Sequence, residues 1–266
     1  MSDLSAAGLQ VAFRGSDFVR HFFFYPTIGS TNEKARELAG RGVEEGTLVV
    51  ADCQTAGQGR SGRHWFSPPG LGLYLSFILR PGVPVEEAFG VHMAFSLGAA
   101  EAAEWARPQG MIGIKWPNDL VAEGRKLAGV LSEVGLSGGR LDWCVVGVGF
   151  NVNNTLKDFP IELRNKATSL REICLRRIDR TELLLEIVAR VGRWYGRFRE
   201  EGMPGLVPEW RRRSTILGRE VRVETPGEVT VGTVSGLAPD GALVVRLESG
   251  VEETIRVGDV DLLQYR

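Results

Sequence analysis

The chain has 266 residues, a mass of 29.1 kDa and a formal net charge of −1, from 32 Lys and Arg against 33 Asp and Glu. This length corresponds to one large domain, or to one large and one small domain, and it allows a sizeable core. The balanced charge argues against a nucleic-acid coat protein, which would be basic. With 43% hydrophobic and 24% charged residues, the composition is globular and excludes a disordered chain.

The cysteines and the N-terminal sequence indicate the cellular compartment of the protein. Cys53, Cys144 and Cys174 lie far apart, and no CxxC or Cys/His cluster occurs, so a zinc site is not expected. The N-terminus lacks the basic and apolar segments of a signal peptide. No apolar run reaches the roughly 18 residues that a transmembrane helix needs. We therefore expect a cytoplasmic protein without a membrane partner.

The N-terminal half predicts alternating strands and helices after a short segment at 1–20. The expected elements are a strand at 22–25, a helix at 32–39, a strand at 47–53, a glycine-rich loop at 54–70, a strand at 72–80 and a helix at 86–106. Ser30 and Glu33 form a capping box at the start of the first helix. The last helix is predicted to bury the face formed by Ala88, Val91, Phe95, Ala99, Ala102 and Trp105.

The sequence pattern of the C-terminal half changes after a run of three arginines at 211–213. Before that run we expect strands at 111–116, 127–134 and 141–150, with a turn at 117–119, and a helix at 181–199. After it, short β-branched runs at 217–264 alternate with Pro-Gly, Pro-Asp-Gly and Ser-Gly turns. This pattern is typical of a small all-β barrel. We expect a larger domain at 1–215 and a smaller one at 216–266.

The glycine-rich loop contains the pattern G-x-G-x-x-G at 57–62, directly after a predicted strand. Dinucleotide-binding folds carry this pattern, but they need a helix that begins in the loop and an acidic residue about 20 residues later. Here prolines and further glycines follow, and no Asp or Glu occurs between Cys53 and Val85. A P-loop is disfavoured even more strongly, because Arg63 and His64 stand where Lys and Ser or Thr are required.

The loop instead has the features of an anion-binding segment. Its glycines let the backbone approach a ligand and donate N–H groups. Arg60 and Arg63 can each hold a carboxylate or phosphate through paired hydrogen bonds. A plain surface loop is the alternative, but the arginine pair, Trp65 and the lack of acidic neighbours favour a function. We expect the loop to cover an anionic ligand and to become ordered when it binds.

Two of only five lysines, Lys115 and Lys126, flank the turn that contains Asn118 and Asp119. A lysine ammonium is a compact point charge suited to a phosphate or carboxylate. Lys126 adjoins an apolar strand, so it needs either an anionic partner or access to solvent. Asn118 and Asp119 can bind a ligand or magnesium, or they can simply form a turn, because Pro-Asn-Asp is a common turn sequence.

A second pair of glycines, Gly147 and Gly149, ends an apolar strand just before Asn151. Small residues at a strand end allow a flat ligand to approach, and an Asn side chain can form hydrogen bonds to the edge of a base. A β-bulge accounts for the glycines equally well, so both interpretations stay open at this point.

Taken in order along the chain, these motifs resemble those of the biotin protein ligases, the biotin–[acetyl-CoA-carboxylase] ligases. The motifs are Ser30-Thr31-Asn32, the loop from Gln54 to Arg63 with Trp65, KWPND at 115–119, KLAG at 126–129, GVGFN at 147–151 and the segment 167–170. The resemblance covers residues 22–266, and the combination is far more specific than any single motif. It implies an α/β (α+β) fold, in which a mixed sheet related to class II synthetase catalytic domains precedes an SH3-like β-barrel.

The resemblance also implies a reaction in two steps. Biotin and ATP, which arrives with Mg²⁺, give biotinyl-5′-AMP and pyrophosphate. The adenylate then acylates a lysine of a biotin carboxyl carrier protein domain of a carboxylase. Lys126 and Arg60 are the implied catalytic residues, because they can neutralise the biotin carboxylate and the α-phosphate as these approach each other. No metal ligands are assigned in the chain itself.

The implied binding residues form two overlapping sets. The positions that match the family's biotin site are Ser30, Thr31, Asn32, Gln54, Gly57, Gln58, Gly59, Arg60, Lys126 and Gly129. The positions that match its ATP site are Arg60, Arg63, Trp65, Lys115, Asn118, Lys126 and Asn151, with Trp65 as a stacking surface for adenine. Closure of the loop is expected to protect the adenylate from water.

Two features depart from the best-known members of the family. Their loop reads G-R-G-R-R-G-R, whereas Gln58 and Ser61 replace two of those arginines here. The change at Ser61 reduces the charge of the loop and bears on how tightly the adenylate is retained. Members that also act as repressors carry an N-terminal winged helix, and only 21 residues precede Phe22, so we expect no DNA partner. A homodimer, which many members form through the sheet, stays open.

Two other functions stay open beside a biotin ligase. A lipoate–protein ligase shares the fold and the adenylation chemistry, and transfer of lipoate in place of biotin would identify it. A non-catalytic biotin sensor would bind biotin without releasing pyrophosphate from ATP, and the intact Lys126 argues against it.

Overall fold

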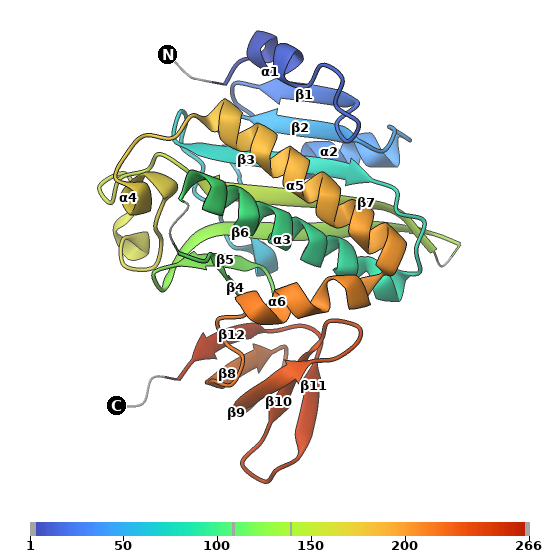
Figure 1. The fold of residues 1–266 in the computed structure, drawn as a ribbon, viewed down its shortest axis with the longest axis vertical. Helices are drawn as coiled ribbons and strands as arrows, with labels where there is room; N and C mark the ends of the chain where they lie inside the picture. Colours follow the sequence, from blue (N-terminus) through green and yellow to red (C-terminus); the bar gives the residue numbers. More distant parts are fainter. Residues whose placement is uncertain (1–3, 108–109, 139, 264–266) are drawn as a thin grey trace.

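The computed structural model describes residues 4–107, 110–138 and 140–263. Its larger part contains a seven-stranded mixed sheet in the order β1-β2-β3-β7-β6-β5-β4 (Figure 1). The strands are β1 (His21–Tyr25), β2 (Thr47–Ala51), β3 (Gly72–Leu79), β4 (Gly113–Lys115), β5 (Asp119–Ala122), β6 (Arg125–Ser137) and β7 (Arg140–Asn151). β1 and β2 are parallel, and the other neighbours are antiparallel.

Helices cover both faces of this sheet. α3 (Ala88–Ala106) and α5 (Arg180–Glu201) pack against each other on one face (Figure 1), where the main apolar core lies. On the other face, α2 (Thr31–Gly40) forms a small second core with side chains of β2, β3 and β7. Because β2 and β3 are covered on both faces, they need apolar residues in nearly every position and are buried throughout. Two shorter helices are α1 (Ala6–Ala12) and α4 (Leu170–Cys174).

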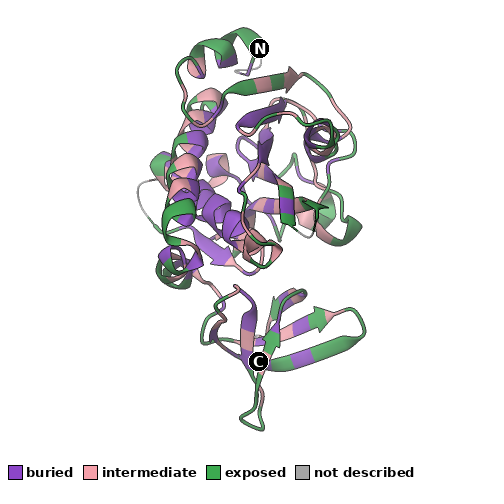
Figure 2. Ribbon diagram, turned by 90° about the vertical axis from the view of Figure 1, so that its right-hand side faces the viewer, coloured by how far each residue is buried: buried purple, intermediate pink, exposed green. Residues whose placement is uncertain are grey.

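A second sheet follows, in the order β11-β10-β9-β8-β12 and with antiparallel pairing throughout. Its strands are β8 (Glu220–Thr225), β9 (Glu228–Leu237), β10 (Leu243–Arg246), β11 (Glu252–Ile255) and β12 (Asp259–Leu262). Buried and exposed positions alternate along these strands (Figure 2), so one face packs inward and the other meets solvent. The predicted fold class, a mixed sheet with helices followed by a small all-β unit, is confirmed.

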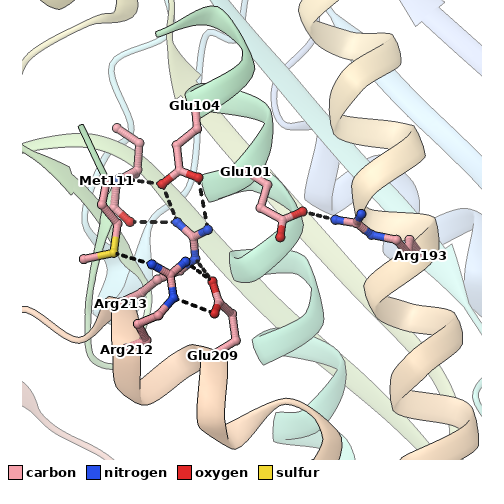
Figure 3. A network of polar contacts seen from close by, with 8 residues as sticks. Glu101, Glu104, Met111, Arg193, Glu209, Arg212 and Arg213 are labelled. Carbon is pink, nitrogen blue, oxygen red and sulfur yellow. Dashed lines mark hydrogen bonds and ion pairs between the residues drawn. The ribbon is translucent and has the colours of Figure 1, made fainter. Parts of the chain in front are cut away.

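α6 (Val207–Arg213) leads from α5 towards the second sheet, and its last residue is a buried arginine. The Arg213 guanidinium donates to Glu104 of α3 at 2.6 and 3.0 Å, to Glu209 at 2.7 Å and to the Ile112 carbonyl at 3.3 Å (Figure 3). Glu104 also accepts a hydrogen bond from the Ile112 N–H at 2.9 Å. This network joins α3, α6 and the segment before β4.

Three details differ from the sequence predictions. The turn at 117–119 leads into an additional strand, β5, because Glu123 and Gly124 adopt positive φ values and reverse the chain into β6. Trp105, expected on the buried face of its helix, is 37% exposed. The sheet and α5 bury nearly all sides of α3, so apolar spacing did not distinguish its faces. α4 and α6 lie in segments for which no element was predicted.

The described part of the chain contains no helix that is long and apolar enough to cross a lipid bilayer. Residues 1–3 and 264–266, at the ends of the two predicted domains, lie outside the described residues.

Candidate active site

A cavity of about 760 Å³ lies beside the start of α2 and extends to the second sheet. Residues of β6 and β7 line it, together with the glycine-rich loop, the turn at 117–119, the loop before α4 and part of the second sheet. The predicted site residues that line it are Ser30, Thr31, Asn32, Gln54, Gln58, Gly59, Arg60, Arg63, Trp65, Lys115, Asn118, Lys126, Gly129 and Asn151. Gly57 does not line the cavity. It is buried within the glycine-rich loop, where its carbonyl accepts a hydrogen bond from the Trp65 N–H at 2.9 Å.

The start of α2 is fixed to the glycine-rich loop by buried hydrogen bonds. Ser30 caps the helix and accepts from the Glu33 N–H, as the capping box predicted. The backbone N–H and the hydroxyl of Thr31 donate to Oε1 of Gln54 at 2.8 and 3.0 Å, and Nε2 of Gln54 donates to Ser67 at 2.9 Å. Both ends of the Gln54 amide are thus bonded within the protein, so Gln54 holds Thr31 in place.

Asn32 is oriented by two residues that the sequence analysis missed. Its Nδ2 donates to Glu133 of β6 at 2.8 Å, and its Oδ1 accepts from the Ser76 hydroxyl of β3 at 2.6 Å. Ser76 is fully buried, and a small polar residue inside an apolar strand is the signal that could have found it. The Arg36 guanidinium lies 3.3 Å from the Glu133 carboxylate and offsets its negative charge. This end of the cavity therefore presents mainly neutral hydrogen-bonding groups.

The glycine-rich loop folds back on itself at the wall of the cavity. The Gly59 N–H donates to the Arg63 carbonyl at 2.7 Å, and the Trp65 N–H donates to the Gly57 carbonyl. At the tip, Ser61 and Gly62 adopt left-handed conformations with φ values of 54° and 71°. This tight hairpin directs Arg60 towards the turn at 117–119, where it donates to Asn118 Oδ1 at 3.3 Å.

The opposite end of the cavity is cationic, and Lys126 lies at its centre. Its Nζ is 2.6 Å from Asp119 Oδ1 and 5.2 Å from the centre of the Trp65 ring. Asp119 therefore supplies the anionic partner that an ammonium group beside an apolar strand needs. Burial lowers the pKa of the Arg60 guanidinium, an effect that Asp259 opposes. A poorly hydrated cation of this kind interacts strongly with an anion that reaches it.

Two carboxylates from β12 also reach this cationic end. Asp259 lies 2.6 Å from Arg63 and 3.6 Å from Arg60, and Asp261 lies 3.8 Å from Lys115. The sequence analysis missed both acids. The Arg63–Asp259 contact spans 196 positions, and no local pattern marks such a pair.

Gly147 and Gly149 provide space for side chains of the site. A Cβ atom at Gly149 would lie 2.6 Å from the Trp65 indole, and one at Gly147 would overlap the Asn32 carboxamide. The β-bulge interpretation is wrong, because both glycines pair in continuous register with β3 and β6. Asn151 follows on the same strand, and its Nδ2 donates to the Lys126 carbonyl at 3.5 Å.

A third lysine reaches the cavity from the loop between β7 and α4. The Lys126 N–H donates to the Lys166 carbonyl at 2.8 Å, and the Thr168 N–H donates to the Lys126 carbonyl at 2.9 Å. This pairing brings Lys166 and Ala167 to the cavity wall. Three of the five lysines thus line one cavity, although the sequence analysis assigned no role to Lys166.

The chain is similar to known proteins over nearly its whole length. Sequence profiles of the Biotin/lipoate A/B protein ligase family and of the Biotin protein ligase C terminal domain match residues 24–151 and 216–263. The bifunctional ligase/repressor BirA of Bacillus subtilis is 31% identical over 259 residues, which span 97% of this chain and 79% of that protein. The biotin–[acetyl-CoA-carboxylase] ligase of Mycobacterium tuberculosis is 34% identical over 241 residues, with coverages of 87% and 85%.

A solved structure agrees with these sequence matches. The biotin protein ligase from Aquifex aeolicus in complex with biotin and ATP superposes with a TM-score of 0.78 and 31% sequence identity. The match covers 92% of this chain and 100% of that one. Identity above 30% with relatives that the chain covers almost completely, together with the shared fold, leads to one assignment. The chain belongs to the biotin protein ligase family.

Proposed function

We propose that this protein is an ATP-dependent ligase that activates biotin as biotinyl-5′-AMP and transfers it to a lysine of a biotin carboxyl carrier protein. The observation that carries the proposal is one cavity with two chemically different ends. Thr31 and Asn32 offer oriented neutral groups at one end, and Arg60, Lys115 and Lys126 offer positive charge at the other. Biotin has a neutral ureido ring and a carboxylate, so its two ends match this arrangement.

In the first step, a biotin carboxylate oxygen attacks the α-phosphorus of ATP, and the bond between the α-phosphorus and the bridging oxygen breaks to release pyrophosphate. Two anions must meet, so the main barrier is electrostatic. Lys126 and Arg60 offset it by neutralising the carboxylate and the α-phosphate in a partly buried site. In the second step, the amine of the carrier lysine attacks the acyl carbon, and AMP leaves.

The remaining residues of the proposal are the positions that match the family's motifs, and their places in the cavity support it. For biotin they are Ser30, Thr31, Asn32, Gln54, Gln58, Gly59 and Gly129, with Gly57 acting through the shape of the loop. For ATP they are Arg63, Trp65, Lys115, Asn118 and Asn151. Among the described residues, no group of three or more His, Cys, Asp or Glu side chains could hold a metal ion. Mg²⁺ is expected to arrive with the triphosphate, as the resemblance implies, and we derive no step through it.

Replacing Lys126 by Ala tests the proposal. We expect Lys126→Ala to lower the rate of biotin-dependent pyrophosphate release by at least about 100-fold, because a charge aimed at the transition state is lost. Its backbone pairing with Lys166 and Thr168 is kept, so the variant should fold. The measurement is pyrophosphate release from ATP and biotin, with the exposed Lys157→Ala as matched control.

The same assay separates the other functions. Transfer of labelled lipoate, but not of labelled biotin, to a carrier domain would replace the proposal by a lipoate ligase. Wild-type protein that binds biotin but releases no pyrophosphate would be a sensor. Wild-type rates in Lys126→Ala would contradict the catalytic role of Lys126.

Several expectations stay predictions within this proposal. They are the division into domains 1–215 and 216–266, a cytoplasmic location, the absence of a DNA partner, and the homodimer that was left open.

A further inference from the structure

Three of the cations proposed to bind ATP, Arg60, Arg63 and Lys115, have anionic partners from the second sheet. One carboxylate, Asp259, lies between two guanidinium groups, at 2.6 Å from Arg63 and 3.6 Å from Arg60. The adjacent carboxylate of β12, Asp261, lies 3.8 Å from Lys115. All of these residues line the cavity. The proposed activity assigns a role to the cations but none to the two acids.

These ion pairs are weak enough to be exchanged. The Asp259 side chain is 41% exposed, that of Asp261 is 74% exposed, and that of Arg63 is 60% exposed. The Asp259–Arg63 and Asp261–Lys115 pairs contribute little, because water reaches their charges. Arg60 is more buried, with 18% of its side chain exposed, but it lies at the longer distance of 3.6 Å from Asp259. A triphosphate carries several negative charges and more acceptor oxygens, so it binds the same cations better than two separate carboxylates.

We infer that the triphosphate of ATP takes the place of Asp259 and Asp261 at Arg60, Arg63 and Lys115. In this inference, which rests on the proposed function, β12 is a positioning element of the ATP site. Its carboxylates hold the three cations towards the cavity before the nucleotide arrives and then release them. ATP must displace these carboxylates, which lowers its apparent affinity. The second sheet thereby influences the apparent affinity of the cavity for ATP.

Two effects of neutralising Asp259 oppose each other, and the contacts of Arg60 decide between them. Loss of the carboxylate removes a competitor of ATP, but it also removes a group that orients Arg60. Arg60 has other partners, however, since it donates to the Gly258 carbonyl at 3.1 Å and to Asn118 at 3.3 Å. An Asn side chain at 259 also keeps an acceptor for Arg63. Orientation is therefore retained, and the removal of the competitor dominates.

The test is the affinity for MgATP in Asp259→Asn, Asp261→Asn and the double variant. We expect Asp259→Asn to lower the KM for ATP about two- to fivefold, as the loss of a competing surface ion pair predicts, with a smaller decrease for Asp261→Asn. The KM for biotin should change little. A mere structural defect does not selectively improve the binding of one substrate. Glu252→Gln is the matched control, because it removes one charge and one exposed ion pair from the same sheet.

Direct binding of labelled MgATP and of AMP separates this inference from the proposed function. If the wild-type protein releases no pyrophosphate, the function fails, but tighter MgATP binding by Asp259→Asn still supports the exchange. AMP lacks the β- and γ-phosphates, so its affinity should rise less than that of ATP. An unchanged or weaker affinity for MgATP in Asp259→Asn, or an equal gain in Glu252→Gln, would overturn the inference.

Discussion

His92 is a buried imidazole directly behind the turn that carries Asn118 and Asp119. Its Nε2 lies 2.8 Å from the Pro117 carbonyl, and its Nδ1 lies 2.9 Å from the Ser132 hydroxyl. A carbonyl only accepts, so the proton is on Nε2 and the Ser132 hydroxyl donates to Nδ1. The Phe89 ring stacks on the imidazole with the ring centres 5.3 Å apart. This arrangement suits a neutral histidine that holds the turn against α3.

The neutral state of His92 makes the stability of the protein depend on pH. Burial lowers the pKa of His92 to about 4, whereas an unfolded histidine has a pKa of about 6.5. As the pH falls, the unfolded chain takes up a proton first, so the stability that neutral His92 contributes is complete above about pH 6.5 and is lost towards about pH 4. From about pH 7 to about pH 5 the loss is about 2 kcal/mol.

Urea unfolding at these two pH values measures this loss. His92→Gln keeps a donor for Pro117 but does not titrate, so its free energy of unfolding should vary less with pH than that of the wild type. His21→Gln is the control, because the His21 side chain is 62% exposed. Parallel pH dependence in the wild type and His92→Gln would show that His92 is not responsible.

At the scale of elements, β7 connects the two ends of the site. Gly147 and Gly149 are two positions apart, so both face the cavity, and each leaves room for one side chain. The space over Gly147 is filled by Asn32, which the proposal assigns to biotin. The space over Gly149 is filled by Trp65, which it assigns to ATP.

Adding a methyl group at each glycine should therefore affect a different substrate. Gly147→Ala displaces Asn32 and should raise the KM for biotin about tenfold, whereas Gly149→Ala displaces Trp65 and should raise the KM for ATP by a similar factor. The two variants control for each other, because they change the same strand by the same group. Steady-state kinetics with each substrate varied in turn gives both constants. An increase in the same KM for both variants would refute the separate roles.

At the scale of the whole molecule, Arg213 joins α3, α6 and the start of β4 just before the second sheet. Only 2% of its side chain is exposed, and Arg213→Ala leaves Glu104 and the Ile112 carbonyl without this donor. Removing one member of a buried ion pair is costly, and both acids are partly exposed, so we expect a loss of about 2–3 kcal/mol in the free energy of unfolding.

The neighbouring arginine provides the control for this prediction. Arg212 pairs with the same Glu209, but its side chain is 57% exposed, so Arg212→Ala should cost at most about 1 kcal/mol. Urea denaturation of both variants tests the difference. Equal losses would mean that burial of Arg213 adds nothing to the ion pair.

Local patterns predicted most of the fold, and the resemblance of the motifs to the family predicted most of the lining of the cavity. The strands of the larger sheet other than β5, the helices α2, α3 and α5, and the all-β C-terminal part were predicted from apolar periodicity and turn residues. β5 was missed because a four-residue strand inside a turn-rich segment leaves no periodic signal. Fourteen of fifteen predicted site residues line the cavity, and Gly57 does not, since its part is to let the loop fold.

By itself, the sequence determined the fold class and the family, because apolar spacing, turn residues and motif order can be read along the chain. Only the tertiary structure decided which charges neutralise one another: Asp119 with Lys126, Asp259 with Arg60 and Arg63, and Glu133 with Arg36. Several of these partners lie far apart in the chain. Even Asp119 and Lys126, which are closest in sequence, come together only because β5 pairs with β6. Their meeting depends on how strands and sheets pack, and no local pattern encodes that packing.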